Sequence, residues 1–122
     1  MEQKQAVDFD EKIMEILLSI GISANLNGYH FLKDSIKMVI DDPTYLSSIT
    51  KKMYPAVADR WSTTTSKVER SIRHALTVSY NKGKMIYLNN LFGVDILDIN
   101  DRPTNAEFVA LLADRLSLEY VK

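Results

Sequence analysis

The chain has 122 residues, of which 46% are hydrophobic and 25% charged, values typical of one soluble globular domain. It has no cysteine, which excludes a disulfide scaffold, a thiolate zinc site and a cysteine nucleophile, and which fits a cytoplasmic location. No apolar run approaches the length of a membrane-spanning helix, and the N-terminus has no signal-peptide core. We therefore expect a domain without membrane association.

The net charge of −1 is unevenly distributed along the chain. Residues 1–49 carry 4 basic and 8 acidic side chains, and residues 85–122 carry 3 basic and 6 acidic ones. Residues 50–84 instead carry 8 basic and 2 acidic side chains, a net charge of +6. A basic segment inside an acidic protein indicates a surface for a polyanion.

Apolar residues at helical spacing predict an all-α fold of about six helices, with the structured domain over residues 9–122. The polar, unpatterned residues 1–8 are expected to form a linker or tail. The first three predicted helices cover about 9–20, 29–41 and 45–53. Gly21 and Pro43 provide stop signals for the first two.

The basic segment contains a short helix, a polar turn and a longer helix. Pro55 suits the first turn of the short helix, where its missing N–H is not needed. The turn covers residues 62–65 and the longer helix about 66–80. Ser66 and Glu69 have the spacing of a capping box, in which two side chains cap each other's backbone N–H groups.

The remaining chain predicts one more short helix, a loop and a last helix. Gly83 ends the long helix, and the short helix is expected over about 85–91. The loop over 92–103 alternates apolar and polar residues and has room for a brief extended segment. Thr104 and Glu107 form a second capping box, which opens the last helix, to about residue 120.

The predicted 66–80 helix separates two classes of side chain. At 100° per residue from Lys67, the apolar face spans 80°–180°. It holds Ala75, Val68, Ser79, Ile72 and Leu76. The opposite face holds Lys67, Ser71, His74, Asn81, Arg70, Thr77 and Arg73, residue types that hydrogen-bond base edges and phosphates. This helix is therefore predicted to be the recognition helix of a DNA-binding helix-turn-helix.

Two features distinguish this motif from the simple helix-turn-helix pattern. Ser71 occupies a position where an aliphatic residue is usual, and Ile72 is expected to take over its packing. The turn over 62–65 lacks the usual glycine. Val68 nevertheless follows Ala58 by ten residues, a spacing that lets the first helix pack on the second. We interpret the pair as a variant helix-turn-helix.

These motifs closely resemble a known family of effector domains. The resemblance is carried by Tyr54-Pro55…Ala58, Val68-Glu69-Arg70…Ile72-Arg73-His74-Ala75, Ile20-Gly21-Ile22, Gly28-Tyr29, Leu91-Phe92-Gly93 and Pro103-Thr104-Asn105…Glu107-Phe108. The chain resembles, over about Phe9–Glu119, the C-terminal effector domains of the stage zero sporulation protein A family. These are response-regulator transcription factors of endospore-forming Firmicutes.

The resemblance implies several properties of the domain. It implies six helices, binding to "0A-box" operators as tandem head-to-tail copies on double-stranded DNA, and activation or repression of sporulation genes through an RNA polymerase sigma factor. It also implies an N-terminal receiver domain, absent from this chain, whose phosphorylation licenses dimerisation. The sigma-contacting surface maps to about Met85–Asp98, including Phe92. From the residues themselves, Tyr87 and Asn89 are expected to be the exposed members of the short helix, and the alternative is that this segment simply caps the core.

The resemblance also implies which residues read DNA. By matching motif positions, the DNA-binding set is Ser66, Lys67, Glu69, Arg70, Arg73 and His74. The family usually has arginine at the position of Lys67. Lysine cannot make the two-pronged guanine contact of arginine, so Lys67 is either a phosphate contact or a single-bond base reader.

Other functions were weighed against DNA binding. His30 and His74 are the only histidines and lie far apart in sequence, so neither a metal site nor a cofactor is expected. No nucleophile motif or glycine-rich phosphate loop indicates an enzyme. Asp41-Asp42 is interpreted as a solvated helix end, and Trp61 and Phe108 sit at core spacing. The rival hypothesis is a helical interaction module whose basic face binds an acidic protein.

Overall fold

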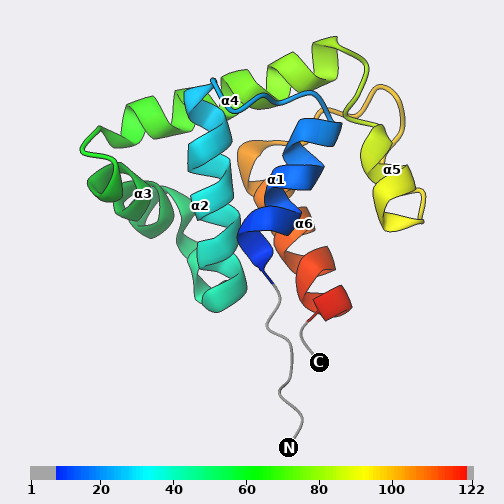
Figure 1. Cartoon of the computed structure of the whole chain (residues 1–122). Coiled ribbons are helices and arrows are strands. Elements are labelled where there is room, and N and C mark those ends of the chain that lie inside the picture. The colour runs from blue at the N-terminus through cyan, green and yellow to red at the C-terminus, as the bar shows by residue number, and fades with distance from the viewer. Residues whose placement is uncertain (1–7, 121–122) are drawn as a thin grey trace, which may run out of the picture.

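The computed structural model describes residues 8–120 and is all-helical, without a β-strand over that range. The elements are α1 (Phe9–Ser19), α2 (Asn27–Asp41), the 3-10 segment η1 (Pro43–Ser48), the π-helical turn η2 (Ile49–Met53), α3 (Tyr54–Arg60), α4 (Thr65–Asn81), α5 (Tyr87–Phe92) and α6 (Asn105–Tyr120). The long helix α4 lies across the ends of α1 and α2 (Figure 1). The predicted all-α class with six α-helices is confirmed.

The first two helices form as their end signals predict. Asp8 caps α1 by accepting a hydrogen bond from the backbone N–H of Glu11 at 3.2 Å. Gly21, with φ of +86°, allows the chain to turn after α1. Helix α2 begins at Asn27, two residues earlier than expected. The rest of the predicted tail, residues 1–7, lies outside the described residues.

The predicted helix over 45–53 is wrong as a single α-helix. Asp42 accepts a 3.1 Å hydrogen bond from the Thr44 backbone N–H, and Ser47 Oγ donates to the Thr44 carbonyl at 2.8 Å. The Asp42 contact caps the segment, whereas the Ser47 contact competes with regular helical hydrogen bonding, and η1 followed by η2 forms in place of one α-helix. The hydrogen bonds from the Thr44 side chain and backbone lower the pKa of the exposed Asp42 carboxyl.

The cap of α4 differs from the predicted pair of Ser66 and Glu69. Thr64 is the N-cap, and its Oγ1 accepts from the Lys67 backbone N–H at 3.1 Å. An N-cap needs extended backbone, which Thr64 has (φ −106°, ψ 156°), whereas Ser66 already lies inside the helix. The predicted box at Thr104 and Glu107 is confirmed, with reciprocal hydrogen bonds of 2.9 and 3.1 Å.

The core lies beneath α4, between α1, α2 and α6. Its largest fully buried side chains include Ile13, Leu17, Leu32, Ile36, Ile72, Leu112 and Phe108. The placement of Phe108 in the core is confirmed, but that of Trp61 is wrong, because its side chain is 45% exposed. The polar edge of an indole ring needs a hydrogen-bond partner, and Trp61 Nε1 finds one by donating to Asp34 at 2.6 Å.

Candidate nucleic-acid interface

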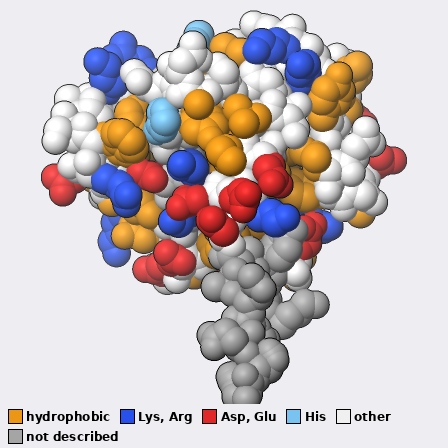
Figure 2. Space-filling view, in the orientation of Figure 1, with side chains coloured by type: hydrophobic (Ala, Val, Ile, Leu, Met, Phe, Trp, Pro, Cys, Tyr) orange, Lys and Arg blue, Asp and Glu red, His pale blue; other side chains and the backbone are white. Residues whose placement is uncertain are grey.

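Helix α4 separates its side chains as the helical periodicity predicts. Val68, Ile72, Ala75, Leu76 and Ser79 are buried. Ser66, Lys67, Arg70, Arg73 and His74 are exposed. Figure 2 shows basic and histidine side chains but no acidic ones along the upper edge, where α4 runs in Figure 1. Acidic side chains gather lower on that face, near the start of α1. The exposed side of α4 is therefore a cationic ridge.

The short helix α3 packs on α4 as a helix-turn-helix requires. Ala58 and Val68, ten residues apart, are 4% and 0% exposed. The turn closes with the backbone N–H of Thr63 donating to the Ala58 carbonyl at 2.9 Å. Ser62 takes the left-handed conformation (φ +52°) that a glycine usually supplies. The variant turn therefore keeps the geometry despite lacking glycine.

A buried carboxylate on α2 holds this turn in place. Asp34 is 8% exposed, and its Oδ2 accepts from Trp61 Nε1 at 2.6 Å and pairs with Arg60 Nε at 3.3 Å. Trp61 and Arg60 end α3 immediately before Ser62. Because one carboxylate binds two consecutive residues, it fixes the path of the chain into the recognition helix.

Helix α2 crosses α4 at very close range. A Cβ at Gly28 would lie 2.2 Å from the Ser71 carbonyl oxygen and 2.8 Å from the Ala75 Cβ, so only glycine fits. The contact is with the backbone of Ser71, so it constrains Gly28 and not the side chain at position 71. Ile72, 0% exposed, provides the packing there, as predicted.

The predicted DNA-binding residues fall on two flanks of α4. Lys67, Arg70 and His74 line a hollow of about 390 Å³ on the side of α2, together with Asn25 and Asn27. Three of the six predicted DNA-binding residues therefore lie together on this flank.

Glu69 and Arg73 lie on the opposite flank of α4. They form an ion pair of 2.7 Å across one helical turn, and Glu69 is half-buried. Ser66 is exposed beside Glu69 at the helix start. The contacts of all six predicted residues with DNA stay a prediction.

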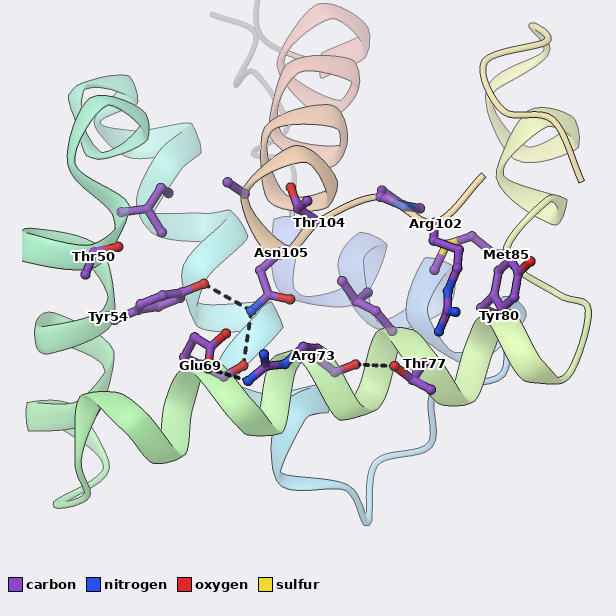
Figure 3. A pocket seen from close by; sticks show the side chains of 14 residues that line it. Thr50, Tyr54, Glu69, Arg73, Thr77, Tyr80, Met85, Arg102, Thr104 and Asn105 are labelled. Carbon is purple, nitrogen blue, oxygen red and sulfur yellow. Dashed lines mark hydrogen bonds and ion pairs between the residues drawn. The ribbon is translucent and has the colours of Figure 1, made fainter. Parts of the chain in front are cut away.

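Glu69 and Arg73 line a cavity of about 510 Å³, here called the α6-side cavity, between α3, α4 and the start of α6. Figure 3 shows Tyr54, Glu69 and Asn105 directed toward one another in it. The Asn105 amide Nδ2 donates to the Tyr54 hydroxyl at 3.0 Å and to the Glu69 carbonyl at 3.1 Å. Asn105 therefore ties three helices together beneath the recognition helix.

This environment changes the acidity of Tyr54. Burial raises the pKa of its hydroxyl above the ordinary 10.0, and the nearby Glu69 carboxylate acts in the same direction. The hydrogen bond from Asn105 and the charge of Arg73 oppose the rise. Tyr54 is thus held neutral, as a structural hydrogen-bonding group.

Sequence reasoning missed Asp34, Tyr54 and Asn105 as supporting residues of the motif. Tyr54 and Asn105 both occur within the motifs that carried the family resemblance, which was a usable signal. Asp34 had no such signal, since an acidic residue in an amphipathic helix usually faces solvent.

The predicted partner surface near α5 is partly corrected. Phe92 is only 8% exposed and Asn89 is not free at the surface. The Asn89 side chain bonds the backbone of Ile96 and Leu97 at 2.7–2.9 Å, pinning the loop where a brief extended segment was anticipated. Tyr87 and Leu91 are both 44% exposed. These two residues, rather than Asn89 and Phe92, are available to a partner.

Two further findings concern the part of the chain that the structure describes. Within residues 8–120, no three histidine or acidic side chains are grouped to hold a metal ion. Over the same range, none of the helices has the length and apolar character needed to cross a bilayer.

Comparison with protein families agrees with this geometry. A family model described as the sporulation initiation factor Spo0A C terminal matches residues 13–116. The match contains all of α2, α3, α4 and α5 and most of α1 and α6. This is a family of helical DNA-binding domains of sporulation transcription factors and not an enzyme family. The chain belongs to the Spo0A C-terminal family.

Proposed function

We propose that this domain recognises 0A-box operators in duplex DNA by placing α4 in the major groove, with tandem copies bound head to tail. The observation that carries the proposal is the separation of α4 into a buried apolar face and an exposed cationic ridge. Membership in a family of DNA-binding domains supports it. An exposed helix bearing arginine, histidine and serine has the donors needed to read base edges.

Arg70 is the residue we propose as the main base reader. It lies near the middle of the exposed arc of α4 and has no salt bridge among the described residues. Its planar guanidinium can donate two hydrogen bonds to one guanine. Arg73 is already paired with Glu69 at 2.7 Å, so base reading by Arg73 requires that pair to rearrange or to bind as a unit.

A fluorescence anisotropy titration tests the proposal. The domain is titrated into a duplex carrying a 0A-box and into a scrambled duplex of the same composition, over a range of salt concentrations. A specific domain prefers the operator by about 10³ or more, and by less for a single copy. Equal affinity for the two duplexes would contradict the proposal and leave a non-specific polyanion binder, the class that includes a module for acidic proteins.

We further propose that the surface around α5 contacts an RNA polymerase sigma factor. Tyr87 and Leu91 are each 44% exposed, and Ile99 in the following loop is 71% exposed. Asp95 and Asp98 are exposed in the same loop as Ile99 and make this segment unsuitable for DNA. A segment with exposed apolar and acidic side chains fits a protein partner that carries basic side chains.

The variant Tyr87→Ser with Leu91→Ser tests this partner surface. We expect it to retain folding and operator affinity but to lose transcription activation in a reconstituted assay. Exposed Leu46→Ser, on η1, is the matched control outside this surface, and Asn89 is avoided because it holds the loop. Unchanged activation, or a parallel loss of DNA binding, would place the partner surface elsewhere.

A further inference from the structure

Two adjoining hollows lie along the α2 side of α4. One, of about 390 Å³, lies beside Arg70 and His74, and the other, of about 270 Å³, lies beside His30 and Trp61. Asn27 and Lys67 line both, so the two meet between these side chains. We call this pair of hollows the α2-side trough.

The trough has an unusual composition for a protein of net charge −1. Its lining includes Lys67, Arg70 and two histidines, and neither hollow is lined by an aspartate or a glutamate. The remaining polar lining consists of asparagine, serine and threonine side chains. These are the residue types that bind phosphate oxygens. The α6-side cavity, in contrast, contains the carboxylate of Glu69.

The walls of the trough are held by fixed contacts. On one side, the close approach of Gly28 to Ser71 sets the distance between α2 and α4. At one end, Asp34 binds Trp61 and thereby fixes the turn at Ser62. Because these contacts are made within the domain, the trough exists before any ligand arrives.

We propose that the α2-side trough holds the phosphate backbone of one DNA strand while α4 occupies the adjacent major groove. The inference rests on the proposed function, since it assigns the strand that borders that groove. A helix lying in a major groove has a phosphate backbone along each side, and the cationic, carboxylate-free flank matches one of them. Lys67 and Asn27 lie at the centre of this path.

This placement assigns Lys67 to phosphate rather than to a base. Lys67 lines both hollows between α2 and α4, at the flank of the ridge, whereas Arg70 lines only one of them. A lysine ammonium serves as a point charge for phosphate and lacks the fork for guanine. Loss of a contact to the DNA backbone weakens operator and non-operator binding alike, whereas loss of a base contact weakens operator binding only.

The experiment measures affinity and its salt dependence for operator and scrambled duplexes. For Lys67→Gln, both affinities fall by the same factor, and the slope of log affinity against log salt falls by about 1. Arg70→Ala instead lowers the preference for the operator. Lys37→Gln removes an equal charge from an exposed ion pair with Asp10 and leaves the slope nearly unchanged.

Two substitutions at Asn27 test the trough without threatening the fold. Asn27 is exposed and is the first residue of α2. Asn27→Asp places a carboxylate where helices favour one, so stability is kept or raised while affinity for both duplexes falls. Asn27→Lys adds a cation to the path and increases the salt slope by about 1.

The outcomes distinguish this inference from the proposed function. If Lys67→Gln weakens operator binding only, Lys67 reads a base and the trough assignment is wrong while the proposed function stands. If neither Asn27 variant changes the affinity of folded protein, the backbone does not pass through the trough. If the wild type binds both duplexes equally, and the Lys67 and Asn27 variants still change that affinity, the proposed function is wrong and the trough assignment stands.

Discussion

The two flanks of the recognition helix differ in how their charges are used. On the α2 side, Lys67, Arg70 and His74 border a trough that no carboxylate lines. On the α6 side, Arg73 is paired with Glu69 at 2.7 Å, and Arg102 lies over the Tyr80 ring at 4.5 Å. One flank therefore presents free cations to an external anion, while the other uses its cations within the domain.

The residues that line the α6-side cavity hold α4 in place. Asn105 bonds Tyr54 on α3 and the backbone of Glu69 on α4, so the start of α6 supports the motif from below (Figure 3). We expect residues on this flank to hold the helix in place, and those on the other flank to contact DNA directly. The comparison shows that the role of a residue on α4 depends on its neighbours as well as on its angular position around the helix.

The largest effect is expected from a substitution that forces α2 and α4 apart. Gly28→Ala places a Cβ within 2.2 Å of the Ser71 carbonyl, so the helices must separate. We expect the free energy of unfolding to fall by about 1–3 kcal/mol or more, as for an overpacked core. Urea denaturation measures this change. Neighbouring Asn27→Ala, at an exposed position, is the control and should change stability by less than about 0.5 kcal/mol.

A second prediction concerns specificity on the α2 side. Arg70→Ala should cost roughly 1–3 kcal/mol of operator binding and relax the preference at one base pair. Anisotropy with a set of single-base-pair operator variants provides the measurement. If all variants lose affinity equally, Arg70 contacts phosphate and a different residue reads the base.

The α6 side yields a smaller prediction, on stability. Tyr54→Phe removes the acceptor of the 3.0 Å hydrogen bond from Asn105, which also bonds the Glu69 carbonyl. A loss of about 0.5–1.5 kcal/mol in the free energy of unfolding at neutral pH is expected. DNA affinity of the folded variant should remain close to wild type, in contrast to Arg70→Ala. A loss of specificity would show that this flank reads DNA too.

The raised pKa of Tyr54 adds a pH dependence on the same flank. The folded pKa lies above the unfolded value of 10.0, so the unfolded chain loses this proton first as pH rises. The contribution of Tyr54 is therefore complete below about pH 10 and is lost as pH rises through the folded pKa. Urea denaturation at pH 9 and pH 11 should show a smaller decrease for Tyr54→Phe than for wild type. Equal decreases would indicate that Tyr54 ionises normally.

The smallest effect is expected for Lys67→Arg. This change keeps the charge in the trough and adds a forked donor, so operator affinity should hold or improve. The same anisotropy assay measures the ratio of operator to scrambled affinity. Weaker operator binding with unchanged scrambled binding would show that the family role of this position does not apply here.

Much of the helical framework could be predicted because its signals are local. The alternation on α4 gave its buried set, and Thr104 with Glu107 marked the start of α6. The errors occurred where several local signals competed. Thr64 and Ser66 are both capping residues, and only the backbone at Thr64 is extended. Around Thr44, a side-chain hydrogen bond from Ser47 competes with the regular helix that the apolar spacing indicated.

The candidate site was predicted only in part, because its residues interact across the chain. The spacing of Trp61 predicted a core residue, but its indole donates a 2.6 Å hydrogen bond to Asp34, 27 positions earlier in the chain. Asn89 looked exposed on its short helix, but its amide binds the following loop. Neither contact leaves a periodic trace in the sequence, so neither is visible to a helical-wheel argument.

The sequence by itself determined the helical class, the cationic face of α4 and the family, since periodicity, capping and motifs are properties of neighbouring residues. Only the tertiary structure decided that Lys67 faces a trough beside α2 while Arg73 lines a cavity shared with Tyr54 and Asn105. That division depends on which helices pack beside α4, and this packing is fixed by Gly28 on one side and Asn105 on the other. Contacts between distant segments set the two environments, so one amphipathic helix acquires two different flanks.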